Sequence, residues 1–526
     1  MTSSGGRSER VEPIADRYLT TFARGGAGSL VGVVASALFG LALVFVVTRS
    51  FTRAEVGAFF ETVALFTIAT TVSVWGADIG LVRTIPRFLV LDRGEHTRPL
   101  IRIAVGSVFA IAIVLATAMA ALAGPVSELV TSGMARTAVE PVIRAAAPFV
   151  PVAAVFAVVL AATRGMGRMG PTNVIDRSGR AAAQPIFALA VAVLGLGTVA
   201  LVVAWALPYA IGCLVAGLWL TRALKRTTVE PRRDTAPVGR ALFAEFWRFA
   251  APRGLAGVFA VAVLWLDTLL IGALRSTQEA GVYAAATRFL IFGGFAAQAV
   301  IQAIGPTLSE LLTRREPEAA AAVYRTGTAW SMALGWPVYL TLAIFAPTLL
   351  SVLGPGYAGA EDALRILAVA MLFASGVGPV DIALLMAGKS SWNLLNTAAA
   401  VAVNVVLNLL LIPRLGITGA AIAWAASIVV NNLVPLIQVR RLVGLHPVGV
   451  ATVSVGLTAI VVFGVIPVAL RVVIPSDGLA LAVSAVVGVL LYLPALWRLR
   501  RTLALDRLAG SVNVGLLRRL RGVHSP

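Results

Sequence analysis

Residues 22–29 read FARGGAGS, and residues 251–258 read APRGLAGV. Each stretch opens a long apolar segment at the same point of its half of the chain. Further matches follow at a nearly constant offset: residues 55–59 (EVGAF) match residues 279–283 (EAGVY), and the offset drifts only from 229 to 219 residues. Two diverged copies with small gaps produce this drift, so the sequence predicts a fold built from two related halves.

The composition indicates an integral membrane protein. The 526 residues are 59% apolar and only 13% charged, with a mean hydropathy of +0.91, whereas a soluble chain is about 25% charged. Apolar segments of about 20 residues are long enough to cross a hydrocarbon core of about 30 Å as helices. An internal repeat in such a chain is typical of transporters built from two halves around a central cavity.

We therefore expect an all-α polytopic membrane protein with about fourteen transmembrane helices. The predicted spans are residues 26–47, 57–81, 103–123, 142–163, 181–199, 201–221, 250–273, 280–308, 327–350, 363–387, 393–412, 418–439, 448–470 and 479–497. The repeat pairs spans 1–6 with spans 7–12, and spans 13 and 14 are extra. Because six is even, both six-helix bundles have the same polarity, which predicts a parallel repeat about the membrane normal.

This count also predicts how the chain is divided. The expected parts are a cytoplasmic N-terminal tail (1–25), a first six-helix bundle (26–221), a cytoplasmic linker (222–249), a second bundle (250–439), two extra transmembrane helices (448–497) and a basic cytoplasmic tail (498–526). Leucines among the arginines of the last part favour a tail that lies partly on the membrane surface.

The basic residues predict the orientation. With the N-terminus in the cytoplasm, the inside segments carry 34 arginines and lysines and the outside loops carry 6. This asymmetry is the pattern of a cytoplasmic-membrane protein with both termini inside. It also explains the net charge of +19, because the basic residues face anionic lipid headgroups. A nucleic-acid partner is therefore not expected.

Arg24 and Arg253 are the symmetric basic pair of the repeat. Each lies at the cytoplasmic mouth of the first helix of its half and is followed by small residues. Small residues permit close helix approach or leave room for a bulky ligand, and guanidinium groups suit phosphate oxygens. Two interpretations remain open, a binding role for this pair or a role as topological anchors.

Several charged residues lie inside predicted spans. Asp267 and Arg288 fall on the consecutive antiparallel spans 7 and 8, and Glu61 on span 2 is at a similar depth. A charge at such depth costs about 3 kcal/mol on insertion scales, so these residues should face a cavity or one another. A mutual ion pair of Asp267 with Arg288 is one alternative. Asp381 on span 10 is a further candidate for coupling or gating.

Two further pairs of polar residues lie on other predicted spans. Asp78 and Arg83 end span 2, where they form either part of an inner gate or a charge cluster at the helix end. Asn404 and Asn408 are four residues apart on span 11 and share one helix face, which favours hydrogen bonds to a neighbouring helix.

The sequence contains no motif that is typical of a nucleotide-binding or metal-binding site. Residues 388–390 read GKS, but the glycine that a phosphate-binding loop needs five residues earlier is replaced by Ala383, and a membrane span precedes the motif. The three histidines are scattered and the chain has one cysteine, so no metal-binding spacing occurs. We expect no cofactor, no metal and no ATPase activity in this chain.

Three stretches carry a family resemblance. Residues 265–272 (WLDTLLIG) with 280–286 (AGVYAAA), residues 404–408 (NVVLN) with 411–423 (LIPRLGITGAAIA), and residues 76–83 (GADIGLVR) occur in a characteristic order. Together they resemble the polysaccharide flippases of the Wzx type, in the multidrug/oligosaccharidyl-lipid/polysaccharide exporter superfamily. The similarity covers about residues 20–440.

The resemblance implies a flippase that moves oligosaccharides on polyprenyl diphosphate from the inner to the outer leaflet for surface polysaccharide synthesis. It implies a V-shaped pair of six-helix bundles whose first two helices line a central cavity, with Arg24, Glu61, Arg83, Asp267 and Arg288 near that cavity. Membrane lipids, a glycan polymerase and glycosyltransferases are the implied partners, and no enzymatic activity is expected.

Three alternatives remain open on the sequence. Fourteen spans exceed the twelve common in the family and match the lipid II flippases, which keeps that function possible. A cation-coupled multidrug exporter of the same superfamily needs intramembrane carboxylates, for which Asp267, Glu61 and Asp381 are available. A scaffold without transport activity is disfavoured, because it needs no charges inside the membrane.

Overall fold

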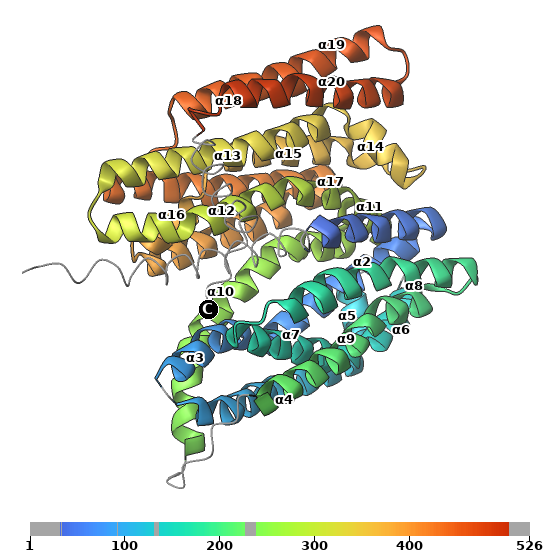
Figure 1. Ribbon diagram of the computed structural model, residues 1–526. Helices are drawn as coiled ribbons and strands as arrows, with labels where there is room; N and C mark the ends of the chain where they lie inside the picture. The colour runs from blue at the N-terminus through green and yellow to red at the C-terminus, as the bar shows by residue number, and fades with distance from the viewer. Residues whose placement is uncertain (1–31, 33, 92, 131–135, 227–237, 504–526) are drawn as a thin grey trace, which may run out of the picture.

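The computed structural model describes residues 32, 34–91, 93–130, 136–226 and 238–503 (Figure 1). Every regular element in these ranges is a helix, and no strand occurs among them. The expected all-α class is thereby confirmed for the described part of the chain.

The first half begins with an apolar helix over Val34–Ser50. The elements that follow are α2 (Arg53–Val74), α3 (Ala77–Val90), η1 (Gly94–His96), α4 (Thr97–Ala121), α5 (Ala123–Val130), α6 (Arg136–Ala146), α7 (Phe149–Gly165), η3 (Thr172–Arg180), α8 (Ala181–Val193) and α9 (Thr198–Arg226).

The second half and the final hairpin complete the described chain. The second half contains α10 (Val238–Leu274), α11 (Thr277–Thr287), η4 (Arg288–Leu290), α12 (Ile291–Thr313), α13 (Pro317–Ile344), α14 (Ala346–Leu353), η5 (Ala358–Ala360), α15 (Glu361–Val377), α16 (Val380–Met386) and α17 (Ser390–Val443). The hairpin contains α18 (Val450–Ile460), η6 (Val461–Val465), α19 (Ile466–Val473) and α20 (Asp477–Arg498).

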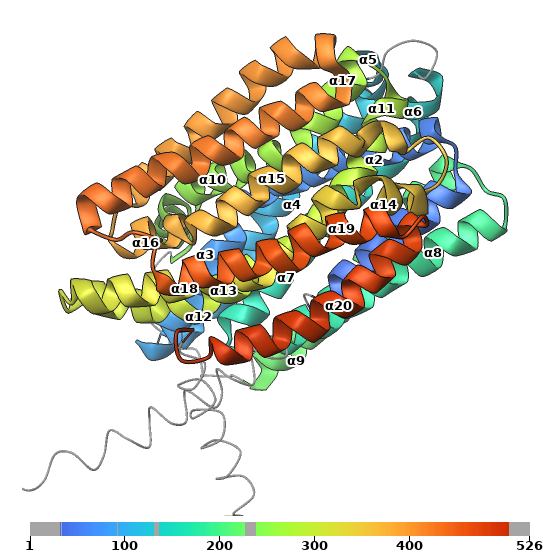
Figure 2. The same ribbon diagram turned by 90° about the horizontal axis from the view of Figure 1, so that it is seen from above.

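The helices run roughly parallel to one long direction of the molecule (Figures 1 and 2). α4, α7 and α9 lie on one side, α13, α15 and α17 lie on the other, and α10 passes between them. The final hairpin packs on the outer side of α13. We call the end near α3 and α16, where α10 begins, the linker end, and the opposite end, near α14, the far end.

Nine helices of the described ranges are long and apolar enough to cross a membrane, or eleven if each of two bent pairs is one span. Three expected spans do not qualify. Val34–Ser50 and α8 are too short, and the side chains of the expected span 280–308 lie partly outside the described residues. The chain is a multi-pass membrane protein, whereas the count of fourteen remains a prediction.

One glycine divides a long helical stretch into two spans. Gly416 has φ 56° and ψ −133° inside α17, a backbone conformation that glycine adopts without the steric cost of a side chain. The turn separates Ser391–Leu415 from Ile417–Val443. These two helices correspond to the expected spans 393–412 and 418–439.

The helix α10 begins inside the expected linker 222–249. Leu242, Phe246 and Ala250 recur every four residues on its first turns, and all three are buried. They pack into the same core as Leu81 and Ile85 of α3. Four-residue spacing places these apolar side chains on one face of the helix, so the start of α10 is attached to the first half before the helix continues into the second.

Two repeat-matched glycines bring the halves together toward the far end. A Cβ atom on Gly57 of α2 would overlap the carbonyl oxygen of Thr277, and one on Gly281 of α11 would lie 2.6 Å from the backbone nitrogen of Gly57. Only glycine permits such an approach of two helix backbones. The EVGAF and EAGVY segments therefore contact each other through their shared glycine.

Replacing Gly281 with valine is expected to destabilise this contact. The added side chain would meet the α2 backbone, and overpacking of this kind costs about 1–3 kcal/mol. We expect a lower melting temperature in detergent. Gly106→Val on α4 is the control, because no atom lies within 4 Å of its added Cβ while the helix-propensity change is the same. Equal melting temperatures for the two variants would contradict the assigned contact.

An arginine joins the halves at the far end. Arg49, in the last turn of the helix Val34–Ser50, donates from Nε to the carbonyl oxygen of Val352 at 2.8 Å and from Nη2 to that of Ser351 at 3.3 Å. These carbonyls belong to the last turn of α14, where the helix dipole favours a cation. Arg49 thus caps a helix of the other half.

Candidate substrate-binding site

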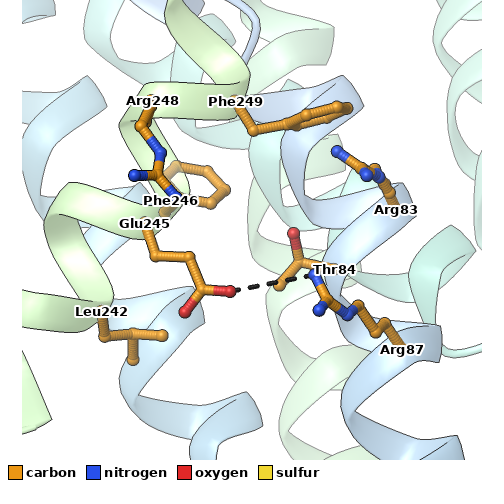
Figure 3. Close-up of a pocket in the computed structure, with 8 residues that line it drawn as sticks. All are labelled: Arg83, Thr84, Arg87, Leu242, Glu245, Phe246, Arg248 and Phe249. Carbon is orange, nitrogen blue, oxygen red and sulfur yellow. Dashed lines mark ion pairs between the residues drawn. The ribbon is translucent and has the colours of Figure 1, made fainter.

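A pocket of about 260 Å³ lies between α3 and α10 near the linker end (Figure 3). Its lining side chains come from one face of each helix: Arg83, Thr84, Arg87, Leu242, Glu245, Phe246, Arg248 and Phe249. Because α3 belongs to the first half and α10 leads into the second, this pocket, here called the arginine pocket, spans the junction of the two.

The arginine pocket is positively charged. Arg83, Arg87 and Arg248 line it, and Glu245 is the acidic residue among its lining side chains. The Arg87 Nη1 atom lies 3.9 Å from Glu245 Oε1, and both side chains are about half exposed. An exposed pair at this distance contributes little to stability, so the pocket keeps an excess of positive charge and is open to solvent.

Phe249 holds two arginines at the edge of this pocket. The guanidinium carbon of Arg83 lies 3.8 Å from the centre of the Phe249 ring, and that of Arg253 lies 3.9 Å from it. Two guanidinium groups this close to one ring centre must lie on its opposite faces. Stacking fixes the planes of both groups and leaves N–H donors at their edges for an incoming anion.

Glycines explain why α3 and α10 lie close enough to form the pocket. Gly76 has φ 79° at the break between α2 and α3, and a Cβ there would lie 2.5 Å from the carbonyl oxygen of Ala250. A Cβ on Gly254 would overlap the backbone of Trp75, and one on Gly80 would lie 2.7 Å from the ring of Phe246. The predicted segments 76–83 and 251–258 therefore pack against each other and carry Arg83 and Arg253 with them.

Asp267 lies in a buried polar network and not in an ion pair with Arg288. Its Oδ1 accepts from Asn408 Nδ2 at 2.7 Å, and its Oδ2 accepts from Tyr283 Oη at 3.0 Å. Asn408 also donates to Asn404 Oδ1 at 3.1 Å. The ion pair that the sequence left open is therefore wrong, whereas the expected hydrogen bonds of Asn404 and Asn408 to another helix are confirmed through Asn408.

Arg288 instead stacks on aromatic rings at the junction of the halves. Its guanidinium carbon lies 4.2 Å from the ring of Trp265 on α10 and 5.7 Å from the ring of Phe60 on α2. The buried Nε atom has no hydrogen-bond partner within the described ranges. Arg288 also borders a cavity of about 250 Å³ in the second half.

Comparison with known proteins identifies the family. The profile of the family described as "Polysaccharide biosynthesis protein" matches residues 22–312, more than half of the chain. The chain belongs to this family. A second profile, MatE, matches residues 252–410. The resemblance to Wzx-type flippases of the exporter superfamily is thereby confirmed.

Two curated proteins of Haloferax volcanii are similar to part of this polysaccharide biosynthesis protein. It is 26% identical to the "Probable low-salt glycan biosynthesis flippase Agl15" over 258 residues, which are 48% of this chain and 54% of the relative. It is 24% identical to the "Probable flippase AglR" over 264 residues, or 48% and 53% of the two chains. The chain thus spans about half the length of the curated relatives it matches.

Solved structures share the fold at low identity. The lipid II flippase MurJ in an inward closed conformation matches with a TM-score of 0.70 and 11% identity, covering 92% of this chain and all of that one. An inward-facing multidrug resistance MATE family transporter of the MOP superfamily matches with a TM-score of 0.63 and 15% identity, covering 78% and 94%. These two matches establish the fold alone.

Within the described residues, Glu61 forms no ion pair with Arg288 and no hydrogen bond with Asp267. It is fully buried on α2, beside Thr277 of α11 and one turn from Gly57. Neither carboxyl oxygen has a hydrogen-bond partner in the part of the chain that the structure describes. Glu61 therefore marks the contact between α2 and α11.

Asp381 borders a cavity of about 180 Å³ in the second half, which shares Gly294 and Met371 with the Arg288 cavity. Ser331, Ser375 and Asn432 line the same cavity, and the buried Oδ1 of Asp381 has no hydrogen-bond partner within the described residues. Asp78 lies near Arg164 of α7 and does not line the arginine pocket. Arg24, the partner of Arg253 in the repeat, lies outside the described residues.

A polar network in the first half was not foreseen. Arg180 Nε lies 2.6 Å from Asp176 Oδ1, and its Nη1 donates to Gln184 at 3.1 Å and to Tyr209 at 3.3 Å. Asp176 and Arg180 lie on η3, a π-helix continuous with α8. The expected span 181–199 omits this segment, although Asp176, Arg180 and Gln184 are spaced four residues apart, which is the signal of a shared helix face.

The described part of the chain has no set of side chains that could hold a metal ion. No cluster of three or more histidine, cysteine, aspartate or glutamate side chains occurs there. The polar side chains of the arginine pocket are its arginines, Thr84 and Glu245, and guanidinium groups bind anions through charge-assisted hydrogen bonds.

Proposed function

We propose that this protein is a flippase for oligosaccharides linked to polyprenyl diphosphate, moving them from the inner to the outer leaflet of the cytoplasmic membrane. The observation that carries the proposal is the arginine pocket with Arg83 and Arg253 on the two faces of Phe249. Membership of the polysaccharide biosynthesis family and the flippase names of the partial relatives support it.

The physical problem is the transfer of a charged headgroup through hydrocarbon. An unpaired buried anion has an idealised solvation cost on the order of 20 kcal/mol. Arginines along the path replace the lost hydration of the diphosphate with charge-assisted hydrogen bonds, while the polyprenyl tail stays in the lipid. In this proposal Arg24, Arg83 and Arg253 receive the diphosphate at the cytoplasmic mouth, and Arg288 lies further along the path, with Glu61 and Asp267 in the buried helix contacts behind it.

The transport cycle in this proposal is alternating access by two bundles, residues 26–221 and 250–439, within a fourteen-span topology. The contact between the repeat-matched Gly57 and Gly281 supports such a pair, because a two-fold axis brings equivalent segments together. The linker 222–249 and both tails lie in the cytoplasm, and the helices 448–497 form an added hairpin.

Loss of Arg49 is expected to favour the state that is open at the far end. Arg49→Ala removes two hydrogen bonds to the last turn of α14, and hydrogen bonds to a charged group contribute about 1.5–3 kcal/mol. Spin labels at the exposed Leu196 and Leu479 should report a larger long-distance population in the variant.

Arg414→Ala is the control for this measurement. Arg414 is also an exposed far-end arginine, but it donates to Leu410 of its own helix. An unchanged distance distribution in Arg49→Ala, or the same change in both variants, would refute the role of Arg49 in holding the halves together.

The energy source in this proposal is an electrochemical gradient and not ATP hydrolysis. A diphosphate diester carries about two negative charges, and each charge gains about 2.3 kcal/mol per 100 mV of inside-negative potential. Asp381, and more weakly Asp78, are the candidates for coupling this transport to a cation. Membrane lipids, a glycan polymerase and glycosyltransferases are the proposed partners.

Asp381→Asn is expected to abolish the effect of an imposed cation gradient on transport. The amide cannot carry the charge that a coupling cation or proton requires, whereas equilibration of the glycan lipid without a gradient should persist. Transport into vesicles with and without sodium or proton gradients measures this. Asp362→Asn, at an exposed position, is the control, and a wild-type gradient response in Asp381→Asn would exclude the coupling role.

Deletion of the gene tests the proposed function in the cell. We expect loss of surface glycan, accumulation of glycan lipid in the inner leaflet and unchanged drug tolerance. Intact surface glycan with greater drug sensitivity would instead support the multidrug exporter, and accumulation of peptidoglycan precursors would support the lipid II flippase.

A further inference from the structure

A second cationic position, Arg288, lies far from the arginine pocket. It borders the 250 Å³ cavity of the second half together with Thr268, Thr287 and Trp424. The arginine pocket and this cavity share no lining residue. The molecule therefore has arginine side chains at two separate cavities.

The positive charge of Arg288 is uncompensated in this structure. No carboxylate forms an ion pair with it within the described ranges, and its buried Nε has no acceptor there. Asp267, three positions along α10 from Leu264 of the cavity wall, is occupied by Asn408 and Tyr283. Arg288 is half-buried, and because a cation partly withdrawn from water without a counter-charge is unfavourable, the cavity is suited to an anion that arrives from outside the protein.

The separation of the two positions limits which anion can fill them at once. Leu264 and Thr268 of the cavity wall follow Arg253 on α10 by 11 and 15 residues, which corresponds to about 16–22 Å at the helical rise of 1.5 Å per residue. A diphosphate group is far shorter than this. When the diphosphate occupies the arginine pocket, the part of the substrate that reaches Arg288 is the glycan.

We propose that the Arg288 cavity binds a sugar that carries a carboxylate, so that the preferred substrate is an acidic oligosaccharide. This proposal rests on the proposed flippase function. A guanidinium group binds a carboxylate through two parallel hydrogen bonds, and its stacking on Trp265 fixes its plane for that geometry.

The other lining groups suit a sugar ring. The hydroxyl of Thr287 donates to the carbonyl oxygen of Ala284, so its lone pairs remain available to a sugar hydroxyl. The ring of Trp424 offers an apolar surface, and a pocket with a few directed polar groups among apolar ones is the usual form of a small-ligand site.

The test compares two glycan lipids that differ in one group. Purified protein is titrated with polyprenyl-diphosphate-linked trisaccharides whose outermost residue is glucuronic acid in one and glucose in the other. We expect the wild type to bind the acidic compound at least ten-fold more tightly. Arg288→Gln should abolish this difference, whereas Arg253→Gln should weaken binding of both compounds and preserve it.

The possible results separate this inference from the proposed function. Equal binding of the two compounds by the wild type would overturn the inference and leave the flippase function intact. A parallel loss for both compounds in Arg288→Gln would also overturn it and assign Arg288 to the diphosphate. Binding of neither compound by the wild type would refute the flippase function and the inference together. A melting temperature of Arg288→Gln equal to that of the wild type ensures that folded protein is compared.

Discussion

Replacing Arg83 and Arg253 together with glutamine is expected to abolish transport of a polyprenyl-diphosphate-linked glycan while leaving the protein folded. Both side chains are exposed to solvent and stack on the same ring, so their loss removes cationic donors without opening a core. A hydrogen bond to a charged group contributes about 1.5–3 kcal/mol. Each single variant should therefore bind about 10- to 100-fold more weakly, and the double variant should show no measurable transport.

Arg314→Gln is the matched control for the arginine pair. Arg314 is exposed near the linker end and pairs with Glu310 on its own helix at 2.7 Å, so the variant loses a basic residue outside the arginine pocket. If Arg83→Gln with Arg253→Gln transports as well as this control, both arginines are topological anchors and the arginine pocket is not the binding site. Arg24→Ala should behave as Arg253→Ala does, because the repeat relates the two positions.

Truncating Asp267 to alanine is expected to destabilise the protein by about 2–6 kcal/mol, because two buried donors lose their acceptor at about 1–3 kcal/mol each. Asp267, Tyr283 and Asn408 are all nearly inaccessible to solvent, so water cannot replace the lost bonds. We expect a melting temperature in detergent that is lower by several degrees.

Asp267→Asn separates hydrogen bonding from charge in this network. The amide keeps one acceptor oxygen and can donate to Asn404 or Asn408, so we expect at least half of the stability to be retained. Asp362→Ala, at an exposed carboxylate, controls for the loss of any acid. A melting temperature of Asp267→Ala equal to that of the control would show that the network does not stabilise the junction of α10, α11 and α17.

Segments that the sequence analysis singled out meet in the structure, although their contacts were not predicted. Gly57 and Gly281 mark one close approach of two backbones, and Gly76 and Gly254 mark another. A close approach of two helix backbones requires glycine irrespective of the surrounding sequence, so the contact position can be recognised in the sequence as a glycine.

Pairing between buried polar groups was harder to predict. Asp267 and Arg288 are adjacent in the predicted topology, yet Asp267 bonds to Asn408, 141 residues away. A helix rotation of one residue changes the direction of a side chain by about 100°, so depth in the membrane alone does not determine partners. Arg288 found aromatic partners instead, Trp265 and Phe60.

Two helix boundaries were also missed for a physical reason. η3 extends the fifth helical segment toward the linker end through charged residues, and α10 begins inside the expected linker. A hydropathy average excludes segments with charged residues from the predicted spans. Asp176 and Arg180 form an ion pair within the helix, so this charged segment can continue the helix although its hydropathy is low. The buried face of α10 repeats every four residues at Leu242 and Phe246, a period that an average over the segment conceals.

Movement of a diphosphate-linked glycan across a bilayer is the central property proposed for this protein. It can be measured directly in vesicles that contain the purified protein. A fluorescent polyprenyl-diphosphate trisaccharide is incorporated into both leaflets, and a membrane-impermeant quencher reports the label that reaches the outer leaflet. We predict complete quenching with the wild-type protein and quenching of the outer leaflet alone with the Arg83→Gln, Arg253→Gln protein. Wild-type vesicles that behave like protein-free vesicles, with and without an imposed membrane potential, would contradict the account.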